Sequence, residues 1–116
     1  STEALSKAVD FSIQANVECT LINCSHADIA SNSIRELART PKFGIFANSS
    51  TFKEIDLSIS TKDIDAIHHL NSEIISAKEY AKIALNWAKE GAYVVGGCCG
   101  TTVEHTKQIK LLLETL

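Results

Sequence analysis

Apolar residues follow two different periods along this chain, and each period predicts one kind of element. Several longer stretches carry apolar side chains at the three- and four-residue spacing of amphipathic helices. These stretches are residues 3–15, 27–39 and 77–90. Between them lie short, nearly continuous apolar runs of the kind found in strands that are buried on both faces. These runs are residues 19–24, 43–47 and 92–95.

The ends of the later elements carry recognisable stop and start signals. Ser76 and Glu79 have the Ser-x-x-Glu spacing of a capping box, which predicts the start of a helix at residue 77. Gly91 follows that helix, where a left-handed glycine commonly ends one. Thr101 and Glu104 repeat the capping-box spacing, so a final helix is expected directly after the last strand.

Strands that alternate with helices in this way favour a parallel sheet with helical crossovers, an α/β fold. About three strand–helix units are present, preceded by one helix, and we expect residues 1–116 to belong to one domain. Residues 49–75 have the weakest periodicity and are interpreted as an irregular loop insertion. A parallel sheet of three strands leaves two edges to be covered. The chain is therefore expected to be part of a larger fold or to find a partner.

The composition is that of an ordinary globular domain, and it argues against two classes of partner. It has 116 residues, of which 45% are apolar and 22% charged, and its net charge is −3. That charge gives no reason to expect nucleic acid or an anionic membrane as a partner. Its apolar runs fall far short of the roughly 20 residues that span a bilayer. With no secretory signal at the start of the sequence, a cytoplasmic location is expected.

Three of the four cysteines follow predicted strands. Cys24 closes the first strand, and Cys98 and Cys99 follow the third. The carboxyl ends of parallel strands meet at one side of a sheet, so these three thiols are expected to converge there. Three sulfur ligands favour a soft or borderline metal such as zinc, and a vacant fourth position is typical of catalytic zinc. The glycine-rich turn of residues 96–100 would let two consecutive side chains reach one ion.

Other interpretations of the same residues stay open. His26 could complete a closed site of three cysteines and one histidine, which would make the metal structural. The glycine turn before a helix could instead cradle a phosphate in a noncatalytic module, although it lacks the Gly-Lys-Ser/Thr ending of a P-loop. Cys19, in the middle of a strand, is more simply a core residue.

Two segments resemble the homocysteine S-methyltransferase family. Residues 96–105, Gly-Gly-Cys-Cys-Gly-Thr-Thr-Val-Glu-His, preceded by Trp-Ala-Lys-Glu-Gly-Ala, are similar to the closing signature of that family. Ile22, Asn23 and Cys24 are similar to its earlier cysteine strand. The resemblance covers essentially the whole chain and corresponds to the last three strands of a (β/α)8 barrel. It departs from the family pattern at Ala47 and Val103, where proline is usual.

The resemblance implies a zinc enzyme that methylates homocysteine to methionine. Cys24, Cys98 and Cys99 would hold Zn²⁺, with the homocysteine sulfur in the open position, and Asn23 and Asn48 would bind substrate. The methyl donor would be S-methylmethionine, S-adenosylmethionine, betaine or methyl-folate. With the first five strands absent, the isolated chain is expected to be weakly active or inactive. Its expected partners are the missing N-terminal part of the barrel or a second copy of itself.

Overall fold

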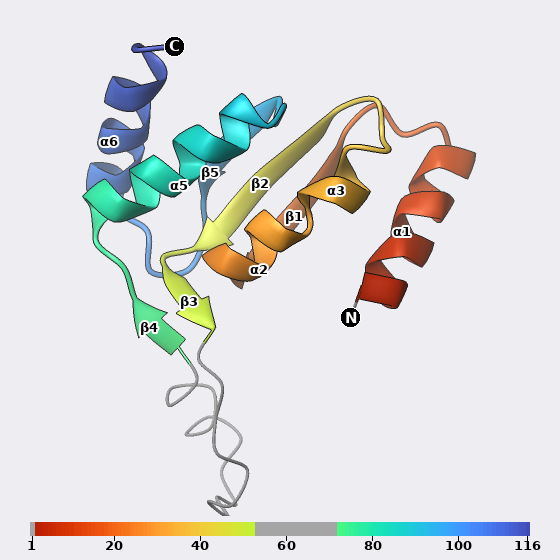
Figure 1. Cartoon of the computed structure of the whole chain (residues 1–116), viewed down its shortest axis with the longest axis horizontal. Helices are drawn as coiled ribbons and strands as arrows, with labels where there is room; N and C mark the ends of the chain where they lie inside the picture. Colours follow the sequence, from red (N-terminus) through yellow and green to blue (C-terminus); the bar gives the residue numbers. More distant parts are fainter. Residues whose placement is uncertain (1, 53–71) are drawn as a thin grey trace, which may run out of the picture.

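The computed structural model describes residues 2–52 and 72–116, drawn in colour in Figure 1. Helices and strands alternate along most of this length. In chain order the elements are α1 (Thr2–Gln14), β1 (Thr20–His26), α2 (Ala27–Asn32), α3 (Ile34–Leu37), β2 (Phe43–Asn48), β3 (Ser50–Phe52), β4 (Ser72–Ile74), α5 (Ala77–Lys89), β5 (Val94–Gly97) and α6 (Val103–Leu113).

The main sheet is parallel and has the order β1-β2-β5. Ile45, in the central strand, lies in register with Ile22 on one side and Val95 on the other. The three strands are thus neighbours in the order in which the chain makes them, each reached through a helical crossover. This confirms the predicted α/β class with a parallel sheet, while the (β/α)8 barrel remains a prediction.

Helices cover one face of the sheet, where the core lies. Phe43, Ile45 and Ala47 alternate along β2 and are all buried. They pack in one cluster with apolar side chains from α2, α3, α5 and α6. Leu21 of β1 lies on the other face of the sheet, opposite the core, and is 47% exposed. Among the described residues, then, the sheet has one covered face and one that is open at β1.

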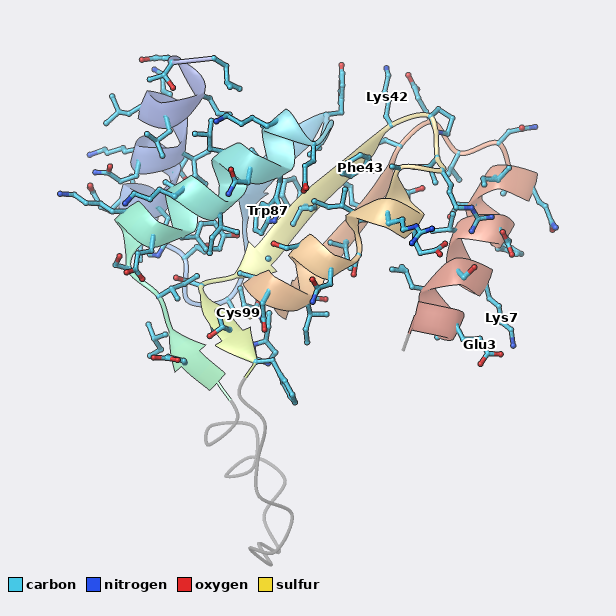
Figure 2. The ribbon with its side chains drawn as sticks, in the orientation of Figure 1. Glu3, Lys7, Lys42, Phe43, Trp87 and Cys99 are labelled. Atoms are coloured by element: carbon cyan, nitrogen blue, oxygen red, sulfur yellow. A yellow bond between two sulfur atoms is a disulfide. The ribbon has the colours of Figure 1, made fainter. Side chains whose placement is uncertain are left out.

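The two aromatic side chains of α5 are the largest members of this core. Tyr80 and Trp87 have no exposed surface, and their rings meet edge to face with centroids 5.7 Å apart. The indole N–H of Trp87 donates to the Ser31 hydroxyl across 2.7 Å, so its one polar atom is satisfied in the interior. Figure 2 shows Trp87 between α5 and β2. The seven-residue spacing of Tyr80 and Trp87 puts both side chains on the buried face of α5.

Helix α1 lies beside the edge of the sheet, well apart from α5 and α6 (Figure 1). It contacts the rest of the chain chiefly through α3. Val9 is buried there, and Asp10 forms an ion pair with Arg39, which also bonds Glu36. Asp10 and Arg39 are exposed and Glu36 is half-buried. The hydrogen bonds to Asp10 and then to Glu36 raise the pKa of the Arg39 guanidinium. The predicted helix of residues 3–15 is present with nearly the expected bounds.

The helix expected over residues 27–39 is wrong in one respect, because the structure divides it at Ser33. The Ser33 hydroxyl donates to the Ile29 carbonyl, and its backbone N–H donates to the Ala30 carbonyl. The hydrogen bond from the Ser33 N–H to the Ala30 carbonyl closes a tighter turn, three residues instead of four, and this interrupts the α-helical repeat. Apolar spacing continues across the break, which is why the sequence pattern gave no sign of it.

The loop interpretation of residues 49–75 needs correction at its two ends. β3 and β4 pair there in an antiparallel ladder, with Thr51 opposite Glu73. These three-residue strands are too short to show a period, and their pairing joins segments about twenty residues apart. The middle of the predicted loop lies outside the described residues.

The boundaries of the last strand and last helix also differ from those expected. The third strand is Val94–Gly97 rather than residues 92–95, and Gly91 ends α5 with a φ of +108°. The N-cap of α6 is Thr102, one residue later than expected, and its partner is His105 instead of Glu104. In the described part of the chain, every helix is too short or too polar to cross a membrane.

Candidate metal centre

The sulfurs of Cys24, Cys98 and Cys99 come together at the carboxyl end of the parallel sheet. All three sulfur atoms lie within 4.8 Å of one another. Figure 2 shows Cys99 beside the arrowhead of β2, with Lys42 and Phe43 at the opposite end of that strand. Residues 74 positions apart in sequence thus meet at one rim of the sheet, the side formed by the carboxyl ends of its strands. They meet there because β1 and β5 flank β2 on either side.

Cys24 reaches this rim through a bulge in β1. The pairing with β2 shifts between Asn23 and His26, so the bulged strand gains a residue relative to its neighbour. Cys24 itself has a φ of +55°, in the left-handed region that costs a residue with a Cβ about 1 kcal/mol. A conformation of this kind persists only where surrounding contacts hold it.

The glycine turn after β5 presents the other two thiols. Cys98 donates its backbone N–H to the Ala47 carbonyl across 2.9 Å, which extends the β2–β5 pairing to the first thiol. Gly100 has a φ of +78°, and Thr101 closes the turn with its backbone N–H and its hydroxyl on the Cys98 carbonyl. The Cys98 and Cys99 sulfurs lie 4.0 Å apart.

Asn48, at the end of β2, connects the two thiol-bearing segments. Its side-chain nitrogen donates to the Cys24 carbonyl and its side-chain oxygen accepts from the Cys99 backbone N–H, each across 3.1 Å. The next residue, Ser49, donates its own backbone N–H to the Cys99 carbonyl across 3.0 Å. The Cys99 peptide is therefore held on both its donor and its acceptor.

The donor set fits zinc in number and chemistry, and one of its sulfur pairs also has the spacing of zinc ligands. Zinc takes thiolate ligands at about 2.3 Å in a tetrahedron, which places ligand sulfurs about 3.8 Å apart. The 4.0 Å between the Cys98 and Cys99 sulfurs is close to that spacing. Within the described ranges, no histidine or carboxylate joins the cluster, so an ion held there would have three protein ligands. Three protein ligands with one open position are typical of catalytic zinc, whereas structural zinc has four.

Two of the three sulfurs are in disulfide contact. Cys24 and Cys98 are paired in this way, with their Cα atoms 5.5 Å apart, and Cys99 is free. The sequence interpretation had no disulfide between these two strands. A bonded pair cannot supply two thiolates, so metal binding requires Cys24 and Cys98 to be reduced.

His26 and Cys19 lie outside the cluster. The His26 ring bonds the Ser50 hydroxyl across 2.9 Å and packs near Phe52, so the structure gives no support to His26 as a fourth ligand. Cys19 is a free, half-buried thiol before β1. Asn23 is exposed on β1, one residue before Cys24 and in register with Phe46. Its expected contact with substrate remains a prediction.

His105 is a supporting residue that the sequence did not single out, because a histidine on a helix is more often solvated than buried. It is buried, and its Nδ1 accepts the Thr102 backbone N–H across 3.0 Å. Nε2 must then carry the proton and donate to the Ser49 hydroxyl, 2.9 Å away, which donates in turn to the Ile75 carbonyl. The signal available in the sequence was its position, three residues after Thr102, where a cap partner lies.

Tyr80 supports the rim from below. Its hydroxyl lies 2.7 Å from the Ala47 carbonyl and 2.8 Å from the Gly96 carbonyl, at the ends of two neighbouring strands. Burial raises the pKa of Tyr80 to about 12. The hydroxyl therefore stays protonated over the whole physiological range and remains a donor to the strand ends.

Comparison with known protein families gives one result that covers nearly the whole chain. The family model described as homocysteine S-methyltransferase matches residues 1–113. The match includes both thiol-bearing segments and Asn48, which connects them.

Proposed function

The chain belongs to the homocysteine S-methyltransferase family, and on that premise we propose that it is the zinc-bearing part of an enzyme that methylates homocysteine. The observation that carries the proposal is the convergence of Cys24, Cys98 and Cys99 within 4.8 Å at the rim of a parallel sheet. Active sites of (β/α)8 barrels lie at this end of the strands.

The three thiolates would hold the ion and leave its fourth position for the substrate sulfur. Zinc, when bound there, would lower the pKa of the homocysteine thiol below that of a free thiol, which is about 8.5 for cysteine, and so present its sulfur as a thiolate at neutral pH. That sulfur would form a bond to the methyl carbon of the donor as the carbon–heteroatom bond of the donor breaks. The electron pair of the broken bond leaves with the donor, and the thiol proton passes to solvent.

The remaining residues of the rim would orient the substrate and the ligands. Asn23 is exposed next to Cys24 and is proposed to face the amino acid part of homocysteine. Asn48 has backbone partners for both ends of its amide, so a contact with substrate would compete with these bonds. The donor is proposed to be a sulfonium, betaine or a methyl-folate, chosen by residues beyond this rim.

We propose that further strands complete the site. β1 and β5 are the two edges of the described sheet, and a partly apolar hollow lies beside each. A cavity of about 500 Å³ beside β1 is lined in part by Leu5, Ile22 and Ile29. Val95 and Ile109 line a second one beside β5. The N-terminal part of a barrel would cover both edges at once, whereas a second copy of this chain is the alternative partner.

The redox state of the three rim cysteines also bears on where the protein works. Metal binding here requires reduced cysteines, and the cytosol keeps thiols reduced. A cytoplasmic location is therefore part of the proposal.

Zinc content of the reduced chain tests the proposal. The protein is purified with a phosphine reductant, and bound zinc, homocysteine binding and methyl transfer from each donor are measured. One zinc per chain, together with homocysteine binding that is lost when the zinc is removed, would support it. Absence of zinc under reducing conditions would refute it, and bound phosphate in its place would favour the noncatalytic phosphate-binding module.

A second candidate function is zinc binding alone, with no methyl transfer by the isolated chain. It is favoured by the two sheet edges, because part of the rim must then come from elsewhere. Addition of the N-terminal strands of a family barrel distinguishes the two candidates. Methyl transfer that appears only in the mixture identifies the isolated chain as the zinc-binding half of the site.

A further inference from the structure

Asn48 is the one side chain of the described rim that contacts both thiol-bearing segments. We propose that Asn48 is a positioning residue that sets the distance between Cys24 and the Cys98–Cys99 pair. The inference rests on the proposed function, because it concerns how the same three thiols are arranged for a metal.

The Asn48 side chain donates one hydrogen bond and accepts the other, and an amide is suited to this position because it does both. The nitrogen donates to the Cys24 carbonyl on one side, and the oxygen accepts the Cys99 N–H on the other. A carboxylate could make only the second bond, and a hydroxyl is too short to span both segments. An amide of this length satisfies a donor and an acceptor at once.

Cys24 needs such a contact more than the other two ligands do. Its φ of +55° is unfavourable for a residue with a Cβ, and it sits in a bulge where regular pairing with β2 is interrupted. The bond from Asn48 engages its carbonyl at that point and holds the left-handed conformation. Cys98, by contrast, is fixed by its own backbone bond to Ala47.

Loss of the amide should therefore release Cys24 and leave the pair after β5 in place. Cys99 keeps its other hydrogen bond, in which its carbonyl accepts the Ser49 backbone N–H, in any Asn48 variant. The expected defect is selective, with two ligands in position and the third displaced. Outer partners that orient metal ligands are typically worth 10- to 100-fold in metal affinity.

The test compares the reduced full chain with Asn48→Ala and Asn48→Leu, the second of which keeps the side-chain volume. Thr40→Ala is the matched control, since it removes a buried hydroxyl that contacts Leu37 and Lys42 at the far end of β2. Circular dichroism and Trp87 fluorescence establish that each variant is folded. Zinc affinity is measured by competition with a chromophoric chelator, and Co²⁺ loading reports the thiolate ligands by their charge-transfer absorption.

Both Asn48 variants are expected to bind zinc about 10- to 100-fold more weakly than the unmodified chain. At saturating Co²⁺ their thiolate absorption should fall by roughly one third, because one of three thiolates is lost. Thr40→Ala should keep both properties. Zinc binding within about twofold of the unmodified chain, or weaker binding with full thiolate absorption, would overturn the positioning role.

A metal-free measurement separates this role from the proposed function. Oxidised glutathione is added to the reduced, metal-free chain, and the rate of Cys24–Cys98 crosslinking is followed by mass spectrometry after alkylation. Each disulfide formed releases two molecules of reduced glutathione. Crosslinking should be slower in both Asn48 variants and unchanged in Thr40→Ala. If the unmodified chain binds no zinc, the enzymatic proposal fails, and slower crosslinking still upholds Asn48 as the residue that positions Cys24; equal rates overturn it.

Discussion

The hydroxyl of Tyr80, on α5, lies 2.7 Å from the carbonyl oxygen of Ala47, the residue whose carbonyl also accepts the Cys98 N–H. One helix side chain thereby supports the end of β2, to which the thiol turn after β5 is hydrogen-bonded. The contact is buried, and its partners come from elements 33 positions apart. It links the stability of the helix layer to the rim.

Tyr80→Phe removes this hydroxyl with almost no change in volume. We expect it to lower the free energy of unfolding by about 0.5–1.5 kcal/mol, the value of one hydrogen bond, because the single hydroxyl proton is shared between the Ala47 and Gly96 carbonyls. Urea denaturation measures the change. Tyr93→Phe is the control, since Tyr93 is 69% exposed and its substitution should cost less than about 0.5 kcal/mol. Equal effects of the two substitutions would contradict a supporting role for Tyr80.

Alkaline pH should weaken the fold through the same residue. Burial raises the Tyr80 pKa to about 12 in the folded chain, above the value of about 10 for an unfolded tyrosine. The unfolded chain therefore loses its proton first, and the stabilisation present below about pH 10 is lost as the pH rises toward 12. Unfolding free energies measured from pH 8 to 11.5 should fall less steeply in Tyr80→Phe. Parallel curves for the two proteins would exclude this linkage.

Trp87 and Ser31 should be energetically coupled. The bond from the indole N–H to the Ser31 hydroxyl spans 2.7 Å within the core. A double-mutant cycle with Trp87→Phe and Ser31→Ala should give a coupling of about 0.5–1.5 kcal/mol. Additive losses would show that the bond contributes nothing. Unfolding of the single variant Ser31→Ala can be followed by fluorescence, because Trp87 is the only tryptophan of the chain.

The three rim thiols should differ from the fourth cysteine in metal binding. Cys24→Ser, Cys98→Ser and Cys99→Ser are each expected to weaken zinc binding by more than about 100-fold, since each removes a direct ligand. Cys19→Ser should leave zinc affinity unchanged, because Cys19 lies outside the cluster. Chelator competition under reducing conditions gives the four values. Full retention of zinc in any rim variant would remove that residue from the ligand set.

Gly100 should matter to the metal and Gly91 only to the fold. Both have positive φ values, +78° and +108°, so alanine at either position should cost about 1–2 kcal/mol of stability. Only Gly100 lies in the turn that presents Cys98 and Cys99, so only Gly100→Ala should also weaken zinc binding. Denaturation and chelator competition on both variants check the difference. A similar zinc affinity in the two variants would show that the turn tolerates the change.

The sequence by itself determined the features that depend on neighbouring residues. The apolar runs set the strands, Ser76 set the start of α5, and Gly91 set its end, each through contacts within a few positions. Cys24, Cys98 and Cys99 could also be placed at strand ends, because parallel connections bring such ends to one side.

Tertiary structure alone decided the contacts between distant segments. The break at Ser33, the pairing of β3 with β4 and the burial of His105 leave no periodic trace. Neither does the bridge that Asn48 makes between Cys24 and Cys99, since its two partners lie 24 and 51 positions away. A hydrogen bond depends on distances of a few tenths of an ångström, and such distances exist only after the helices and strands have packed.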